Sequence, residues 1–532
     1  MAPSPRFRAR LQWFEIGFAV ALCAWAFAPL IYLAVHGARA DLFYTGVTSI
    51  IAADEFQYMS WIRQFSHHAL ASNLFRLDQT PRDFLHPMFL PSGLLLRAGV
   101  DLRLVYLAWL PVAVAVLGAG YIVYVRRLVA PGGGPRLAAL ALGGFYLTPI
   151  LALMIAANAG GVPMQFTVAG VASEMSPSFT LWGNFPAGIA LGLTPPLLLW
   201  LVSLSGQTGP AGRPPFRLYL LTAIAGLIVS WLHPWQGEVL VLSILGLAAW
   251  DRFRRRNLRL VIPALATSLP LGYYFALSRL DPSWAHGTSI NSGFNVPLVD
   301  VAIVLLPLLL LALPGLRPAA ANPLERTLYV WLAAMAVLYF AIRPPFALHG
   351  LEGVSLPLGI LAVRGWTAFR RRPVSEIAAA ATAVLVVLLL TAPSYYVYAD
   401  IFRQNALRRS QPYYLAAGEV QALSWLSATP APGGVLSAIY LGQLIPAYTG
   451  RRTWIGHGSW SPDFLDRFDA AQRLFDGQMD GESTLRLVRG SGARFLVSDC
   501  QTHHDLSDKL RPLLVTVHEF GCATVYEVDA TR

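Results

Sequence analysis

Charged side chains are scarce in this chain of 532 residues: lysine, arginine, aspartate and glutamate together make up only 13% of it. Soluble domains usually carry about 25% charged residues, so the scarcity argues against a soluble protein. Hydrophobic residues reach 55%, and the mean hydropathy is +0.51. This composition is typical of a polytopic α-helical membrane protein, in which each span needs about 20 apolar residues.

Lysine is almost absent: Lys509 is the only lysine in the chain. The formal net charge of +11 therefore comes from arginine. A large positive charge is also found in nucleic-acid-binding proteins. Here, however, the arginines form short clusters between long apolar runs, as the positive-inside rule requires of membrane proteins. We therefore expect membrane lipids, and no nucleic acid, among the partners.

An internal sequence repeat is also lacking. Many transporters consist of two related halves with paired broken helices. The absence therefore weighs against a transporter or flippase, although it leaves that class open as an alternative.

The arginine clusters predict about eleven spans with the N-terminus inside. The first apolar run is too long for the core of a signal peptide, so we expect it to be retained. The stretch 218–250 has Arg217 and Arg252 at its ends and a turn-like sequence at His233, which predicts two short spans in a tight hairpin. The predicted spans cover about 14–36, 102–125, 137–156, 186–204, 218–250 (two spans), 260–277, 298–313, 328–342, 354–363 and 377–391.

The composition changes near residue 393, which divides the chain into a membrane part at 1–395 and a small outer α/β domain at 396–532. Whether Cys500 and Cys522 form a disulfide there is left open by the sequence. Helical patterns cover 418–427, 464–475 and 483–488, and strand-like runs cover 435–439, 494–497, 513–517 and 524–528.

Two adjacent carboxylates, Asp54 and Glu55, follow the first span and open a long outer loop at 37–100. A carboxylate at the bilayer centre costs about 2.5–3.5 kcal/mol, so we expect both to face a water-filled cavity or the headgroups. Phe56, Met59 and Ile62 recur at every third residue, which predicts an amphipathic helix lying in the interface. Neighbours on a helix point about 100° apart, so the two acids should have different partners. Alternatively, they only cap the helix.

This loop resembles that of the GT-C membrane glycosyltransferases, which use polyprenyl-phosphate-linked sugars and include protein mannosyltransferases and aminoarabinose transferases. Asp54, Glu55 and Tyr58 are similar to the Asp-Glu-x-x-Tyr pattern of that superfamily, and Leu85–Gly93 is similar to its His-Pro-rich approach to the second span. The stretch 445–452 with Gly456-His457 looks like the exterior domain of uncharacterised bacterial members. The stricter Asp-x-Asp form is missing, which puts metal dependence in doubt.

The resemblance implies a multi-pass enzyme of the bacterial cytoplasmic membrane whose C-terminal domain is extracytoplasmic. It would transfer a sugar from a polyprenyl-phosphate-linked donor to a hydroxyl of a glycan, lipid or protein. By this analogy Asp54 is the general base and Glu55 an orienter or second carboxylate. The leaving phosphate needs a cation; Arg343 is the first choice, because it lies at the outer end of a span against the positive-inside trend. It also has the position of an interfacial, snorkelling arginine.

Other polar residues of the outer loops are candidates for binding phosphate or substrate. Each also has a structural interpretation, as a turn residue, a helix cap or part of an aromatic belt, and for Glu174 we expect a solvated side chain. No cofactor is certain; a divalent metal stays open, because acids and histidines are available without a fixed ligand spacing. The phosphate candidates are Arg63 and Arg82, and the substrate candidates are Tyr58, Asp83, His86, His233, His349 and Glu352.

A polymerase or ligase of lipid-linked glycans would have a similar topology and similar outer-loop arginines and histidines. The acidic pair directly after the first span favours the GT-C interpretation over both this alternative and a transporter. The identity of the sugar and of the acceptor is left open by the sequence.

Overall fold

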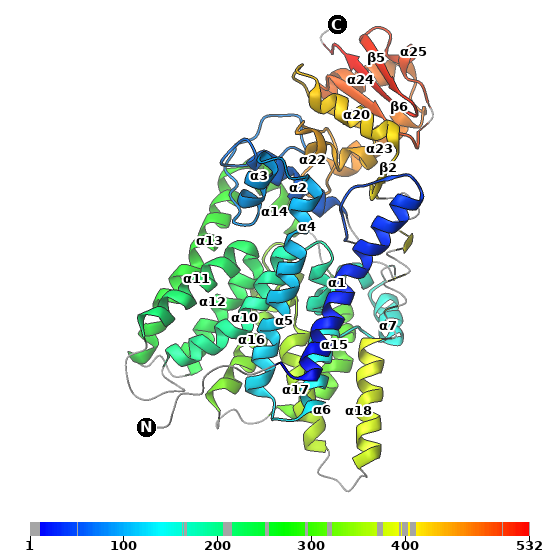
Figure 1. The fold of residues 1–532 in the computed structure, drawn as a ribbon. Helices are drawn as coiled ribbons and strands as arrows, with labels where there is room; N and C mark the ends of the chain where they lie inside the picture. The colour runs from blue at the N-terminus through cyan, green and yellow to red at the C-terminus, as the bar shows by residue number, and fades with distance from the viewer. Residues whose placement is uncertain are drawn as a thin grey trace.

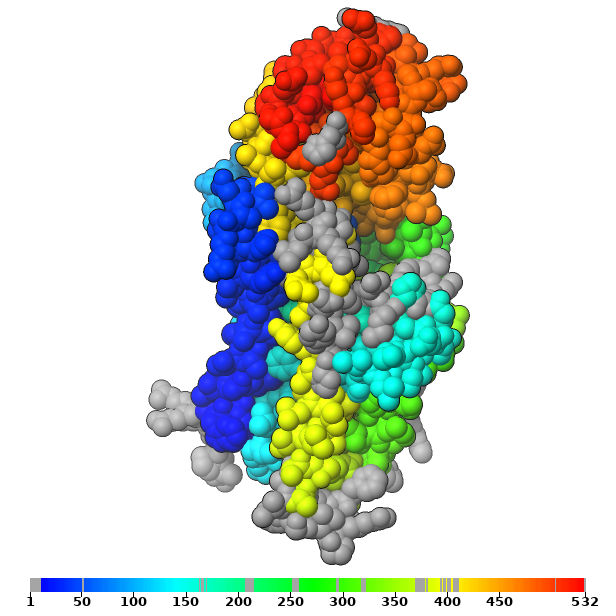
Figure 2. Space-filling view, turned by 90° about the vertical axis from the view of Figure 1, so that its right-hand side faces the viewer, coloured from blue at the N-terminus to red at the C-terminus, as the bar shows by residue number. Residues whose placement is uncertain are grey.

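The apolar helices of the computed structural model form a bundle, and the C-terminal residues gather at one end of it (Figures 1 and 2). The structure describes residues 11–530 apart from 50–51, 162, 164–166, 206–214, 251–254, 293–295, 317–321, 370–375, 393–394, 396–398, 400–402, 405–410 and 503. Arg252 and most of the predicted boundary region around residue 395 thus lie outside the described residues.

Each predicted span falls mainly on helical residues. Seven helical stretches in the described part of the chain are long and apolar enough to cross a membrane, and others, such as α11, are shorter. The helices of the bundle are α1 (Trp13–Arg39), α4 (Leu102–Leu107), α5 (Trp109–Leu128), α6 (Gly133–Phe145), α7 (Ile150–Gly160), α10 (Phe185–Leu204), α11 (Phe216–Leu232), α12 (Pro234–Trp250), α13 (Val261–Leu280), α15 (Leu298–Ala312), α16 (Arg326–Ala336) with the π-helix η6 (Val337–Ile342), α17 (Ser355–Phe369) and α18 (Glu376–Thr391).

Small residues let these helices approach closely. A Cβ atom on Gly120 of α5 would lie 1.8 Å from the carbonyl oxygen of Gly192 in α10, so no larger residue fits at this crossing. Close backbone approach at glycine is common in membrane helix packing, where dispersion contacts replace the hydrophobic effect.

The span predicted at 137–156 is not one continuous helix. It breaks between α6 and α7 at residues 146–149, because Pro149 cannot continue the hydrogen bonds of a helix. The backbone amide of Leu147 instead donates to Leu390 of α18, and the hydroxyls of Tyr146 and Thr148 donate to Val304 of α15. Neighbouring helices thus provide hydrogen-bond partners for polar groups of the irregular segment, as an apolar environment requires.

The predicted hairpin at 218–250 is present. His233 alone separates α11 from α12, and the two helices lie side by side (Figure 1). Near the turn, a Cβ on Gly237 would lie 2.7 Å from the Cα of Ser230. This close approach brings His233 to the end of the bundle that faces the C-terminal residues.

The helix predicted after the first span is present as α2 (Ala52–Phe65), but it does not lie at an exposed interface. Most of its apolar residues and its polar Gln57, Ser60 and Gln64 are buried. It packs against α3 (Phe89–Arg97), α4 and the short α22 (Ile445–Thr449). The pattern could not reveal that C-terminal residues, among them α22, cover part of α2.

The C-terminal part contains a four-stranded sheet of order β3-β4-β6-β5, in which β3 and β4 are parallel and the other neighbours antiparallel. The disulfide Cys500–Cys522 is formed, with the two Cα atoms 4.8 Å apart. The predicted strands and helices are confirmed as β3 (Val435–Ser437), β4 (Phe495–Ser498), β5 (Leu514–Phe520), β6 (Ala523–Val528), α20 (Ala417–Ala428), α23 (Phe464–Phe475) and α24 (Gly481–Ser491).

Aromatic packing joins the first outer loop to the C-terminal part. Trp284 of α14 (Pro282–Ser292) lies with its ring centroid 6.3 Å from that of Trp61 in α2 and 4.9 Å from that of Trp460. Phe84 stacks at 4.2 Å on Trp61. Strand β1 (Phe43–Tyr44) also pairs with β2 (Tyr414–Leu415). These contacts fix the C-terminal residues above α2.

Candidate active site

A small polar cavity of about 130 Å³ lies between α2, the segment that precedes α10 and the loop between η6 and α17. It gathers three carboxylates and a histidine in a protein that has few charged residues. The residues that line it are Ser49, Asp54, Ser173, Glu174, Phe179, Thr180, Trp182, Asn184, His349 and Glu352.

Asp54 reaches this cavity from the first turn of α2, and its side chain is 61% exposed there. Its Oδ1 atom lies 2.9 Å from Nε2 of His457, which comes from the C-terminal part. Burial acts to raise the pKa of Asp54, but the hydrogen bond and charge of His457 and the charge of His349 outweigh it and lower the pKa. The carboxylate is therefore ionised and available as a proton acceptor.

Glu55, the neighbouring acid, points elsewhere. Its carboxylate accepts hydrogen bonds from the backbone amides of Thr48 and Ser49 at 2.6–3.0 Å and from the Tyr106 hydroxyl at 3.0 Å. It is fully buried and is not among the described residues that line the cavity. The two acids thus have different partners, and the arrangement offers Glu55 no contact with a substrate in this cavity.

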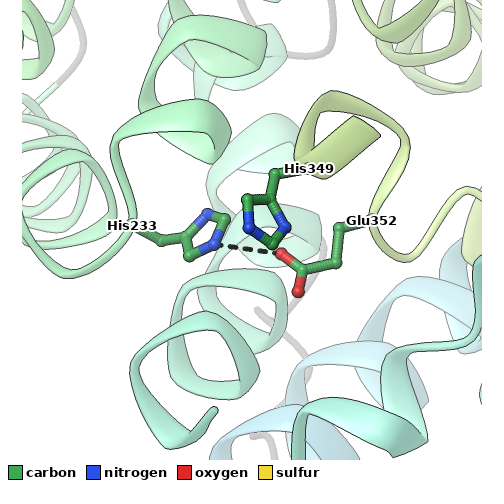
Figure 3. A group of neighbouring side chains, drawn as sticks. All are labelled: His233, His349 and Glu352. Carbon is green, nitrogen blue, oxygen red and sulfur yellow. Dashed lines mark ion pairs between the residues drawn. The ribbon is translucent and has the colours of Figure 1, made fainter. Parts of the chain in front are cut away.

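His233, His349 and Glu352 form a cluster (Figure 3), and two of its members, His349 and Glu352, line the cavity. His233 comes from the α11–α12 turn, and the other two come from the loop before α17. Nε2 of His233 lies 3.1 Å from Oε2 of Glu352, and one ligand atom from each residue falls within 4.8 Å of the others. Gln236 holds this loop by donating to the carbonyl oxygens of His349 and Glu352.

Glu174 orients His349. Its Oε2 lies 3.0 Å from Nδ1 of the imidazole, so Nε2 is left to face the cluster. Burial lowers the pKa of His349, but the surrounding carboxylates, led by Glu174, outweigh it and raise the pKa to about 9. The expectation that Glu174 is solvated was wrong: its side chain is 15% exposed, because the loop before α17 closes over it.

The donor set of this cluster fits a divalent cation. Two imidazoles and one carboxylate are a known ligand set of catalytic zinc, and a carboxylate that holds the far nitrogen of a ligand histidine is a common supporting contact. Nδ1 of His233 is buried and has no hydrogen-bond partner among the described residues, and Oε2 of Glu352 is buried against Nε2 of His233. A cation held here would supply positive charge close to Asp54.

Arg343 lies at a second cavity, of about 370 Å³, whose lining also includes Asn291, Tyr339 and Phe346. Its backbone is left-handed (φ 52°), which ends η6 and turns the chain toward His349. The Phe346 ring lies 4.3 Å from the His349 ring. The second cavity therefore adjoins the polar cavity, and Arg343 contributes a guanidinium to the lining of the second cavity.

Tyr58 lies one helical turn after Asp54 and stacks on Phe89 at 5.2 Å. Burial raises the pKa of its hydroxyl, and the Asp54 and Glu352 carboxylates raise it further. Tyr58 is not among the described residues that line the polar cavity, but both of these carboxylates do line it, so its neutral hydroxyl stays a candidate hydrogen-bond donor to a substrate.

Four other predicted residues are not among the described residues that line the polar cavity. Asp83 faces Asp281, and burial together with that charge raises its pKa to about 6. His86 is buried against Phe89, and burial lowers its pKa to about 3. Arg63 donates to Ser427, and Arg82 is exposed. These side chains serve the packing and surface of the outer loop.

No model of a protein family matches this chain, and no curated protein matches it. Among solved structures, ArnT from Cupriavidus metallidurans bound to undecaprenyl phosphate superposes with a TM-score of 0.51 at 12% identity, covering 96% of this chain and 97% of ArnT. The arabinofuranosyltransferase AftD from mycobacteria gives 0.52 at 15% identity, with 98% of this chain and 42% of AftD covered. This chain has the GT-C fold.

The GT-C fold agrees with the architecture predicted from the first outer loop, a helical membrane part followed by a C-terminal α/β part. The chain spans less than half the length of AftD. At these identities the likeness concerns the fold, so the roles of the residues depend on the geometry of the cavity.

Proposed function

We propose that this protein is an integral-membrane glycosyltransferase that moves a sugar from a polyprenyl-phosphate-linked donor to an acceptor hydroxyl. One observation carries the proposal: an exposed, ionised Asp54 shares a polar cavity with His349 and Glu352, which form a cluster with His233. ArnT, which shares the fold, was crystallised with undecaprenyl phosphate.

In this proposal, Asp54 takes the proton of the acceptor hydroxyl as that oxygen attacks the anomeric carbon of the donor sugar. A bond forms between the acceptor oxygen and the anomeric carbon, and the bond from that carbon to the phosphate oxygen breaks. Polyprenyl phosphate leaves with the electron pair and carries the negative charge. The Asp54 carboxylate is suited to this task because it is exposed to the cavity.

The charge of the leaving phosphate requires positive groups nearby. Arg343, in the adjoining cavity, is proposed to bind the donor phosphate. The His233–His349–Glu352 cluster would hold a divalent cation, which, when bound, stabilises the same negative charge. Tyr58 would donate a hydrogen bond to a sugar hydroxyl from the α2 wall.

We also propose the topology and location. Residues 1–395 form the membrane part with an inside N-terminus, and residues 396–532 form a domain on the outer side of a bacterial cytoplasmic membrane. The disulfide Cys500–Cys522 supports an oxidising outer compartment for the second part.

The test is a transfer assay on purified protein with polyprenyl-phosphate-linked sugars and a membrane extract as the source of acceptors. Asp54→Asn should lower the rate about 10²- to 10⁴-fold, the usual contribution of a general base, with an unchanged thermal transition. Asp469→Asn is the matched control, because Asp469 is 71% exposed in α23 and faces only Arg473. Well-folded wild-type protein without Asp54-dependent transfer, with and without added metal, would favour a transporter.

Cation binding is tested separately, by titrating metal-stripped protein with Zn²⁺ or Mn²⁺ in a calorimeter. Glu174→Gln should weaken binding about 10- to 100-fold, the usual cost of removing a group that orients a ligand histidine. His233→Ala should weaken it further, since it removes a ligand. Equal affinity in wild type and both variants would exclude this cluster as a cation site.

A further inference from the structure

The contact between His457 and Asp54 joins two residues 403 positions apart. His457 is 7% exposed and belongs to the C-terminal part, whereas Asp54 lies in the first turn of α2. The resemblance to exterior domains drew attention to Gly456-His457, but it gave His457 no role in the site.

Hydrogen bonding sets the tautomer of His457. The backbone amide of Ser459 donates to Nδ1 at 3.1 Å. Since that nitrogen accepts, Nε2 carries the proton and donates to Oδ1 of Asp54 at 2.9 Å. The imidazole therefore binds one carboxylate oxygen and leaves the other to the cavity.

The turn that carries His457 is tightly held. The Ser461 hydroxyl accepts hydrogen bonds from the backbone amides of Gly456 and His457 at 3.1 and 3.2 Å. The His457 ring also packs at 5.6 Å against Phe75 of the first outer loop. A ring fixed on both sides can fix the carboxylate that it contacts.

The same stretch is anchored to the first outer loop by backbone contacts. Thr453 donates its amide to Leu74, Arg452 donates to the carbonyl oxygens of Asn73 and Asp78, and Asn73 donates to the Trp460 carbonyl. The C-terminal part thus holds the first outer loop, which contains Asp54. The positions of the C-terminal part and of Asp54 are therefore coupled.

We propose that the C-terminal part completes the active site by placing His457 as the positioning residue of Asp54. His457 holds the carboxylate in the orientation in which its free oxygen faces the acceptor hydroxyl. The C-terminal part is then required for the chemical step itself, whatever else it binds. This inference depends on the proposed role of Asp54 as the base.

The test compares His457→Ala, His457→Gln and wild type in the transfer assay with full-length protein. In His457→Ala, kcat should fall about 10- to 100-fold, since misplacing a catalytic group by about 1 Å can cost about 100-fold. KM for the lipid-linked donor should change little, because His457 is not among the described residues that line the cavity. In His457→Gln, the side-chain amide can donate to Asp54, so part of the lost kcat should return.

The acidic limb of the kcat–pH profile provides a readout that a loss of folding would not move. The groups that face Asp54 are His457, His349 and the Glu174 and Glu352 carboxylates across the cavity, with Glu55 and Tyr58 on its own helix. Because the hydrogen bond from His457 lowers the pKa of Asp54, the limb should move to higher pH in His457→Ala.

His518→Ala is the matched control, because His518 also lies in the C-terminal part but stacks on Trp425, away from the cavity. It should leave kcat and the pH profile unchanged. If the wild type is active and His457→Ala is equally active, the role of His457 is overturned and the proposed function is left intact. Equal losses in His457→Ala and His457→Gln with an unmoved acidic limb would also overturn it. Inactive wild type would instead contradict the proposed function.

Discussion

The two sides of α2 place adjacent carboxylates in opposite environments. Asp54 is 61% exposed to a cavity and has one strong partner, His457. Glu55 is completely buried, and two backbone amides and the Tyr106 hydroxyl donate to it. The first arrangement leaves a carboxylate oxygen free for chemistry, whereas the second occupies both oxygens within the fold.

The difference concerns what would separate a reactive acid from a structural one under the proposed function. Charge alone does not do so, because both residues are acidic and follow the same span. The partners decide: Glu55 ties residues 48–49 to the start of α2, and this contact fixes the position from which Asp54 enters the cavity. We therefore propose a structural role for Glu55, in place of the catalytic one expected from the motif.

Matched amide substitutions give the largest contrast between the two sides. Asp54→Asn removes the base, whereas in Glu55→Gln the amide oxygen still accepts from Thr48 and Ser49 and the amide nitrogen can donate to Tyr106. We expect transfer to be lost in the first variant, by about 10²- to 10⁴-fold, and to be retained in the second. A loss in Glu55→Gln as large as that in Asp54→Asn would restore the catalytic assignment of Glu55.

Glu55→Ala tests the structural side of the comparison between Asp54 and Glu55, through the thermal stability of the protein. It leaves the buried amides of Thr48 and Ser49 without an acceptor, and each unpaired group costs about 1–3 kcal/mol. We expect a lower thermal transition in detergent for Glu55→Ala than for wild type or Glu55→Gln, measured by the fluorescence of the tryptophans. An unchanged transition in Glu55→Ala would mean that Glu55 does not secure this loop.

Much of the fold could be predicted because it depends on local patterns. Long apolar runs with arginines at alternate ends predicted the helices, and short strand-like runs in the C-terminal part predicted β3 to β6. The break at Pro149 was missed because hydropathy averages over it. The burial of α2 was missed because it depends on residues about 390 positions away, such as α22.

The candidate site divides in the same way. Asp54, His349 and Glu352, which line the cavity, could be named from the sequence because acids and histidines in outer loops stand out against apolar spans. Glu174 and His457 were missed because their importance comes from contacts across 175 and 403 positions of sequence. Asp83 and His86 looked equally suitable, yet they pack away from the cavity, which residue type alone could not show.

The smallest expected effect is a pH dependence of stability. Burial raises the pKa of Glu55 from 4.5 to about 7, against the hydrogen bonds from Ser49, Thr48 and Tyr106 that lower it. Between these two values the folded protein binds more protons at this site than the unfolded chain does, so stability falls as pH rises. The contribution is at most about 3 kcal/mol, at about 1.4 kcal/mol per pKa unit.

Thermal transitions measured from about pH 4.5 to about pH 7 should therefore decline more steeply with pH in wild type than in Glu55→Gln, which cannot ionise. Above about pH 7 the two curves should run parallel, because Glu55 is then ionised in both states of the wild type. Identical slopes in both proteins would show that Glu55 is already ionised at low pH in the folded state. Its hydrogen bonds would then outweigh burial, and Glu55 would resemble Asp54 in charge while still differing from it in access to the cavity.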